Sequence, residues 1–178
     1  MPAPTQPLLC ALLRGESPPW PADQPNVEAF LIDARYHGVM PLLDAHFRTL
    51  GSDPHFEDRW PDAIRRACRD DALLQSMQEL VHQTELVRVL AELAASDIAP
   101  LILKGTALAH SHYPSPALRP RGDTDLLIPE SQVRATAAVL DRLGYERGRG
   151  VTGALISYEA NWSRDTAAGI THNLDVHW

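Results

Sequence analysis

The stretch Leu118-Arg-Pro-Arg-Gly-Asp-Thr-Asp-Leu-Leu-Ile128 decides the fold, because it leads from a polar loop into a short apolar strand that Pro129 ends. Residues two apart in a strand point to the same side, so Asp123 and Asp125 present two carboxylates together. Like charges so close repel each other, and a cation between them relieves the repulsion. The stretch predicts a strand with two carboxylates that favour a bound cation. An Asp-x-Asp pair alone also fits a solvated strand edge or an Asx-turn.

A third carboxylate lies downstream, in the alternating segment from Ile170 to Trp178. Alternation places Asp175 on a polar face together with His177, and the opposite face is mostly apolar. Residues 155–162 also alternate, and the turn-like segment 164–169 predicts a hairpin. If the Asp175 strand is a neighbour of the Asp-x-Asp strand, three carboxylates converge, as a two-metal phosphoryl-transfer site requires. On this alternation His177 also lines the site.

A glycine turn precedes the acidic strand. Residues 98–103 form a short apolar run without polar alternation, which predicts a strand buried on both faces. Lys104-Gly105-Thr106 follows it, and Thr106 to Tyr113 has a helical pattern. Free backbone N–H groups at the start of this helix suit phosphate oxygens, and Gly105 lets the backbone approach a ligand closely. The same sequence also fits an ordinary strand-to-helix turn that binds no phosphate.

The rest of the chain is mainly helical in its first half. Helical spacing predicts four helices there and one after the acidic strand: Pro7–Arg14, Val27–Arg35, Pro41–Leu50, Asp71–Ala95 and Ser131–Leu143. In the longest, Leu73, Met77, Leu80 and Val87 belong to the predicted buried stripe, which Leu74, Leu86, Val89 and Leu93 widen. We expect an α/β (α+β) fold: a small mixed β-sheet with an N-terminal helical region, divided into residues 1–96 and 97–178.

Composition narrows the function classes. The 178 residues are 44% hydrophobic and 22% charged, typical of a folded globular chain. Lys plus Arg is 16 against 23 for Asp plus Glu, a net charge of −7, which disfavours nucleic-acid partners. No apolar stretch reaches the roughly 18 to 20 residues that span a bilayer, and the N-terminus lacks the basic region of a signal peptide. We expect a cytoplasmic protein without a membrane partner.

Five short motifs, taken in order along the chain, resemble a known pattern: Lys104-Gly105, Tyr113-Pro114, Arg119-Pro120, Gly122 to Asp125 and Asp175 to His177. It is that of the bacterial uncharacterised nucleotidyltransferase family, within the DNA polymerase β-type nucleotidyltransferase superfamily. The segment Ala34-Arg-Tyr-His-Gly-Val-Met-Pro-Leu-Leu43 is similar to that family's helical half. The superfamily usually has Gly-Ser or Gly-Gly where this chain has Gly105-Thr106, and relatives usually continue beyond the third carboxylate. The resemblance therefore implies a catalytic core truncated at its C-terminus.

The resemblance implies a transferase that moves a nucleoside monophosphate from an NTP, with ATP favoured, to an acceptor and releases pyrophosphate. Asp123, Asp125 and Asp175 would be catalytic and would hold two Mg²⁺ or Mn²⁺ ions. Lys104, Gly105, Thr106 and Arg119 would bind the nucleotide, with the cations placed near its triphosphate. Arg121 is also a local cation, but we expect it to be a solvated loop charge. The acceptor is a hydroxyl-type group on a small molecule or protein, and its identity and the oligomeric state are not encoded in the pattern.

Two other readings remain open. The same fold without transfer chemistry would serve as a binding or regulatory module that acts through protein contacts, which the Gly105-Thr106 variant favours. Nucleic-acid polymerisation is disfavoured by the −7 charge and the lack of a basic stripe. A zinc site is also disfavoured, because His110 and His112 diverge on a helix and no cysteine lies near them in sequence.

Overall fold

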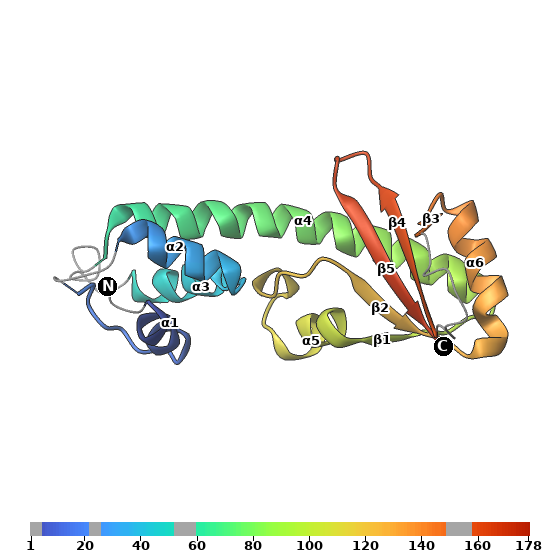
Figure 1. The fold of residues 1–178 in the computed structure, drawn as a ribbon, viewed down its shortest axis with the longest axis horizontal. Coiled ribbons are helices and arrows are strands. Elements are labelled where there is room, and N and C mark those ends of the chain that lie inside the picture. The colour runs from blue at the N-terminus through green and yellow to red at the C-terminus, as the bar shows by residue number, and fades with distance from the viewer. Residues whose placement is uncertain (1–4, 22–25, 52–59, 149–157) are drawn as a thin grey trace. The chain divides into compact units, whose positions relative to one another are not determined.

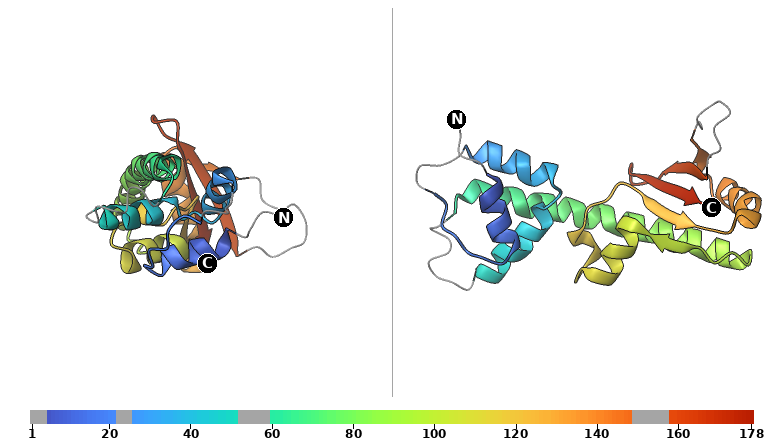
Figure 2. Two further views of the ribbon diagram at one scale, coloured as in Figure 1. Left: turned by 90° about the vertical axis from the view of Figure 1, so that its left-hand side faces the viewer. Right: turned by 60° about the horizontal axis from the view of Figure 1, so that its bottom comes forward.

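The computed structural model describes residues 5–21, 26–51, 60–148 and 158–178. The chain packs as two compact units (Figures 1 and 2). The first consists of residues 1–76 and 117–120, and the second of residues 77–116 and 121–178. Helix α4 (Asp62–Ala95) contributes to both units. The predicted boundary between residues 96 and 97 stays a prediction.

The first unit is a helical bundle around an aromatic core. It contains α1 (Gln6–Leu13), α2 (Val27–Tyr36), α3 (Met40–Leu50) and the start of α4. Helix α2 begins where the side chain of Asn26 accepts a hydrogen bond from the backbone N–H of Glu28, and ends before Gly38, whose φ of +65° favours glycine. The core rings contact one another at centroid distances of 5.1 to 5.6 Å: Trp20, Phe30, Phe47 and Trp60.

Helix α4 differs from its prediction in length and in the face that it buries. It begins at Asp62, nine residues before the predicted start at Asp71. The predicted stripe is mostly exposed: Leu73 63%, Met77 60%, Leu80 65% and Val87 61%. Three of the four residues expected only to widen it are buried instead, namely Leu86, Val89 and Leu93, whereas Leu74 is 56% exposed. The assignment of the core stripe was wrong because apolar residues cover more than one face of this helix, and the period alone does not say which face meets the sheet.

The second unit is built on a five-stranded mixed sheet of order β1-β2-β5-β4-β3. Its strands are β1 (Leu101–Leu103), β2 (Thr124–Leu127), β3 (Glu146–Arg147), β4 (Glu159–Asp165) and β5 (Thr171–His177). Strands β2 and β5 are parallel, and the other pairs are antiparallel. The mixed α/β fold with an N-terminal helical region is confirmed. The β4–β5 hairpin is also confirmed, although residues 155–157 of its predicted first strand lie outside the described residues.

Strand β1 is not buried on both faces. It is antiparallel to β2 and forms one edge of the sheet, and Leu101 is 63% exposed. The expectation was wrong because a continuous apolar run is typical of an interior strand, whereas β1 is an edge strand of three residues. Helix α5 (Lys104–His112) follows without a linker and begins two residues before the predicted Thr106. Gly105 therefore lies inside its first turn.

One face of the sheet packs on α4 and α6 (Val133–Arg142), which follows the short 3₁₀ turn η3 (Glu130–Gln132). The alternation predicted for β5 is confirmed, because His172, Leu174 and Val176 are at most 2% exposed on this face. The core formed here includes Val89, Leu93, Leu126, Val139, Leu140 and Trp162. No helix in the described part of the chain is long and apolar enough to cross a membrane.

Candidate active site

The opposite face of the sheet carries polar side chains from three adjacent strands. The register places Asp125 of β2 opposite Asp175 of β5, and Asp175 opposite Asn161 of β4. Asp123 directly precedes β2, and the β4–β5 pairing places Asn173 opposite Ser163. At the other end His177 lies opposite Glu159. Residues two apart share a face, so these side chains form one polar surface.

Asp125 is the buried member of this surface, with its residue only 3% exposed. The Lys104 ammonium donates to its Oδ1 at 2.6 Å, and Nε2 of His177 lies 2.9 Å from the same oxygen. Nδ1 of His177 lies 3.4 Å from the Glu159 carboxylate. Burial acts to raise the pKa of Asp125, but the hydrogen bonds from Lys104 and His177 outweigh it and hold this pKa below its ordinary value. Asp125 is therefore a carboxylate that is held ionised by the adjacent Lys104 ammonium and by its contact with His177.

Lys104 is the only lysine in the sequence, and its backbone φ of +46° is unusual for a residue other than glycine. Its side chain is 62% exposed, whereas the Asp125 side chain is 5% exposed. The hydrogen bond to Asp125 raises the pKa of the Lys104 ammonium. The ion pair therefore joins a buried anion to a cation that solvent still reaches.

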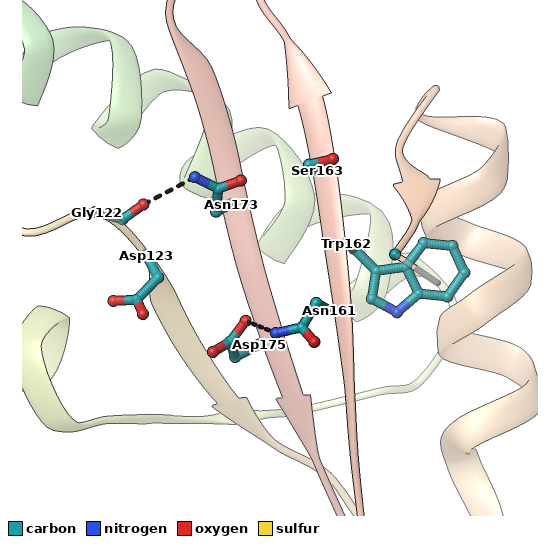
Figure 3. A pocket seen from close by; sticks show the side chains of 8 residues that line it. Gly122, Asp123, Asn161, Trp162, Ser163, Asn173 and Asp175 are labelled. Carbon is teal, nitrogen blue, oxygen red and sulfur yellow. Dashed lines mark hydrogen bonds between the residues drawn. The ribbon is translucent and has the colours of Figure 1, made fainter. Parts of the chain in front are cut away.

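The other two predicted carboxylates line a cavity of about 440 Å³ (Figure 3). Asp123 is exposed, and Asp175 Oδ1 accepts a 2.6 Å hydrogen bond from Nδ2 of Asn161. Nδ2 of Asn173 donates to the carbonyl oxygen of Gly122 at 3.0 Å, which ties β5 to the residue before Asp123. The strand pairing thus places Asp125 beside Asp175, but the side chain of Asp125 is engaged by Lys104 and His177. Among the residues that the structure describes, no three His, Cys, Asp or Glu side chains form a metal-binding group.

Gly105 and Thr106 lie in the first turn of α5, which has no side-chain cap on its N-terminus. The Thr106 hydroxyl is buried, 3.1 Å from the Thr124 hydroxyl, and it accepts a 3.0 Å hydrogen bond from Nε of Arg121. Its role is therefore to hold the turn against β2. The backbone N–H groups of the turn are the donors that remain for a phosphate.

Arg121 is the main residue that the sequence reasoning undervalued. It was expected to be a solvated loop cation, but its side chain is 5% exposed. Its guanidinium donates to both carboxylate oxygens of Glu79 at 2.6 and 2.9 Å, and the Glu79 side chain is 7% exposed. The prediction was wrong because Glu79 is 42 positions away in sequence, on α4. No local pattern identifies such a partner.

Arg119 is the predicted site residue that does not belong to the sheet unit. It lies in the segment 117–120, which packs with the helical unit, so the geometry of the sheet unit does not include it. Sequence reasoning also omitted Asn161 and Ser163. Their alternation with the core residue Trp162 was the available signal, but the predicted strand ended at Trp162 and left Ser163 outside it, before the turn predicted at 164–169.

The fold and this surface define a class: an α/β protein with carboxylates on paired strands and a glycine turn opening the adjacent helix. The whole segment 23–178 matches the model of a family described as uncharacterised nucleotidyltransferase. The chain belongs to this nucleotidyltransferase family, which confirms the resemblance at that level. No curated protein and no solved structure matches the chain.

Proposed function

We propose that the protein is a metal-dependent nucleotidyltransferase of the DNA polymerase β type, which transfers a nucleoside monophosphate from an NTP to a hydroxyl-type acceptor. We also propose that ATP is the donor and that the enzyme is bacterial and cytoplasmic. The observation that carries it is the parallel register that sets Asp125 beside Asp175, in a chain of a nucleotidyltransferase family. The uncapped start of α5 directly follows the edge strand that pairs with β2.

The residues present fit a hard divalent cation in donor chemistry. Asp123, Asp125 and Asp175 supply carboxylate oxygens from two paired strands, the ligands that Mg²⁺ and Mn²⁺ prefer. The Lys104 ammonium at 2.6 Å from Asp125 shows that this carboxylate attracts a positive charge. We propose that the three aspartates hold two such ions. When bound, these ions would polarise the phosphates and lower the pKa of the acceptor hydroxyl.

The proposed reaction needs three actions from the chain's own residues. The backbone N–H groups of Gly105 and Thr106 hold the triphosphate, and Lys104 and Arg119 neutralise it. Asp175 accepts the proton of the acceptor hydroxyl as its oxygen attacks the α-phosphorus. A new bond joins the acceptor oxygen to the α-phosphorus, the bond from the α-phosphorus to the bridging oxygen breaks, and pyrophosphate leaves with that electron pair.

Calorimetric titration of Mg²⁺-ATP and of the other three Mg²⁺-NTPs tests this function. We expect binding to the parent chain and its loss in the Asp123→Asn/Asp125→Asn double variant. Asp165→Asn is the matched control, because this carboxylate is also exposed on the sheet but accepts its hydrogen bond from Thr171 instead. Absence of binding to a folded parent chain, or equal binding to the double variant, would contradict the proposal.

A second candidate is a binding or regulatory module with the same fold and no transfer activity. One observation favours it: Lys104 and His177 already engage Asp125, so its charge is balanced without a metal ion. The module predicts that nucleotide and Mg²⁺ leave the Lys104–Asp125 pair intact. A nucleotidyltransferase requires Asp125 to exchange the ammonium for the ion.

A further inference from the structure

His177 lies between two carboxylates on the polar surface of the sheet. Its Nε2 lies 2.9 Å from Oδ1 of Asp125, and its Nδ1 lies 3.4 Å from the carboxylate of Glu159. The strand register sets His177 opposite Leu127 of β2 and opposite Glu159 of β4. The imidazole therefore links Asp125 of β2 to Glu159 of β4 across β5.

The backbone around His177 is fixed on both sides. Its carbonyl oxygen accepts a 2.9 Å hydrogen bond from the N–H of Ile128, the residue after β2. The N–H of Trp178 donates to the carbonyl oxygen of Tyr158, the residue before β4, at 3.0 Å. The His177 side chain is 19% exposed. Because the ring is mostly enclosed and has a carboxylate at each nitrogen, it has little freedom to rotate.

Asp125 receives both of its side-chain contacts on one oxygen. Lys104 and His177 both reach Oδ1, and Oδ2 makes no hydrogen bond with the rest of the described chain. An ionised carboxylate only accepts hydrogen bonds, so Nε2 is the nitrogen of His177 that carries the hydrogen. Oδ2 is therefore the oxygen of Asp125 that is left for an ion.

The two partners of Oδ1 differ in how easily they leave it. The Lys104 side chain is long, flexible and 62% exposed, whereas His177 is held by backbone bonds to both neighbouring strands. A triphosphate would also offer the ammonium other oxygens to bind. We therefore expect His177 to stay at Asp125 when Lys104 leaves. In protein metal sites, a carboxylate that binds the metal is commonly oriented by a hydrogen bond from a neighbouring side chain.

We propose that His177 is a positioning residue of the metal site: it holds Oδ1 of Asp125 after Lys104 has left, and so keeps Oδ2 available to a divalent cation. This inference rests on the proposed function and adds a residue to which that proposal gives no role. Glu159 supports the ring, because its carboxylate contacts the other nitrogen. Lys104 and His177 thus act differently at the same oxygen. The lysine gives way to the ion, and the histidine orients the carboxylate that binds it.

Two amide variants separate the contacts of the two ring nitrogens. The side-chain nitrogen of Gln is as many bonds from Cα as Nε2 of His, and that of Asn is as many as Nδ1. His177→Gln therefore keeps a donor near Asp125, and His177→Asn keeps only the contact with Glu159. EPR of free Mn²⁺ measures binding of this ion to the full chain without nucleotide. The binding should weaken by about tenfold or more in His177→Asn and by at most about threefold in His177→Gln.

The matched controls are His112→Asn and His112→Gln, at the exposed end of α5, which should leave Mn²⁺ binding unchanged. Urea denaturation of every variant shows that the binding is compared between folded chains. Equal Mn²⁺ affinity of folded His177→Gln and His177→Asn would overturn the inference, because the hydrogen bond to Asp125 would then not matter for the ion.

The ring nitrogens of His177 give a second readout by ¹H–¹⁵N NMR, with their signals assigned by their loss in His177→Gln. When Mg²⁺-ATP is added, Nε2 should keep its hydrogen, while the Lys104 ammonium moves away from Asp125. Loss of the hydrogen from Nε2 would overturn the inference, because His177 would then no longer donate to Asp125.

The Mn²⁺ measurement also distinguishes this inference from the function on which it rests. If the folded parent chain binds no Mn²⁺, or if Asp123→Asn/Asp125→Asn binds it equally well, the proposed metal site and the role of His177 are both overturned. If the double variant loses the binding but His177→Asn does not weaken it, only the role of His177 is overturned.

Discussion

Two ion pairs flank the turn that opens α5, and they differ in how far water reaches them. Arg121 and Glu79 are both buried, at 5% and 7% side-chain exposure, and form a bidentate contact. In the other pair Asp125 is 5% exposed and Lys104 62% exposed. A buried charge without its partner is strongly unfavourable, whereas an exposed ammonium is readily solvated. The first pair is therefore a permanent part of the fold, and the second is able to exchange its cation.

The difference separates structure from function in this small unit. Arg121 also donates to the Thr106 hydroxyl, so the buried pair fixes the turn through which α5 faces β2. Lys104 begins α5 and reaches the strand aspartate across the same turn. The buried Arg121–Glu79 pair thus stabilises the turn, and the Lys104–Asp125 pair at the same turn is open to solvent.

The largest effect should come from breaking the buried pair. Glu79→Gln leaves Arg121 buried without a counter-charge and should lower the free energy of unfolding by about 3 to 5 kcal/mol. Asp71→Asn is the control on the same helix, because its pair with Arg35 is 29% and 52% exposed and should contribute at most about 1 kcal/mol. Urea denaturation measures both. Equal losses in the two variants would contradict the distinction between buried and exposed pairs.

The buried hydrogen bond between His172 and Tyr145 joins neutral side chains, and it makes the free energy of unfolding depend on pH. His172 is fully buried, and its Nδ1 lies 2.7 Å from the Tyr145 hydroxyl. Burial, assisted by His82 and Arg121, lowers the pKa of His172 from 6.5 to about 4. Between these values the unfolded chain binds a proton that the folded chain does not, so stability falls as pH decreases from 6.5 to 4. The loss should approach about 3 kcal/mol.

Unfolding measured from pH 7 to pH 4 checks this dependence. His172→Gln should reduce the slope, and His112→Gln, at the exposed end of α5, should leave it unchanged. Burial also lowers the pKa of His82, which acts in the same direction, so part of the slope should remain in His172→Gln. A slope that is identical in parent and His172→Gln would show that His172 is not the group responsible.

The smallest effect on stability is expected at the exchangeable pair. Lys104→Met removes a mostly exposed ammonium and should lower the free energy of unfolding much less than Glu79→Gln does, because His177 still contacts Asp125. Mg²⁺ alone should then bind about tenfold tighter, because the ion no longer competes with Lys104 for Asp125, while Mg²⁺-ATP should bind more weakly. Calorimetry with each ligand separates these opposite changes. Weaker binding of both would indicate that Lys104 does not compete with the ion.

The single lysine allows the exchange to be observed directly. Reductive ¹³C-methylation labels only Lys104 and the N-terminal amine, and the Lys104 signal reports whether its ammonium remains against Asp125. Adding Mg²⁺-ATP should shift this signal, because the ammonium leaves Asp125 for the triphosphate. Asp125→Asn should produce a comparable shift without any ligand. A signal unmoved by Mg²⁺-ATP would favour the binding module.

Much of the polar surface follows from strand alternation. Period-two placement of Asn173, Asp175 and His177 opposite the apolar residues of β5 was predicted and is confirmed, because a strand buried on one face has no other arrangement. Gly144, with φ of +80°, follows the helix whose end was predicted at Leu143 and which ends at Arg142. These features depend on neighbours within a few residues. The roles assigned to the aspartates and to the nucleotide-binding residues stay predictions.

The features that sequence reasoning missed depend on distant partners. The exposed face of α4 and the edge position of β1 are set by which elements cover them, and apolar spacing carries no such information. Arg121 pairs with Glu79 across 42 positions, and Arg164 donates to Glu85 across 79. Their burial is a property of the packed unit. A charged residue in a loop has the same local sequence whether it is solvated or paired.

Periodicity and short motifs are local, so they were enough to predict most element types, the polar face of β5 and the nucleotidyltransferase family of the chain. Only the tertiary structure decided that β2 and β5 are parallel neighbours with Asp125 opposite Asp175, and that Lys104 and His177 hold Asp125. Strand order and side-chain pairing depend on the burial and charge of segments far apart in the chain. Those quantities exist only once the chain has folded.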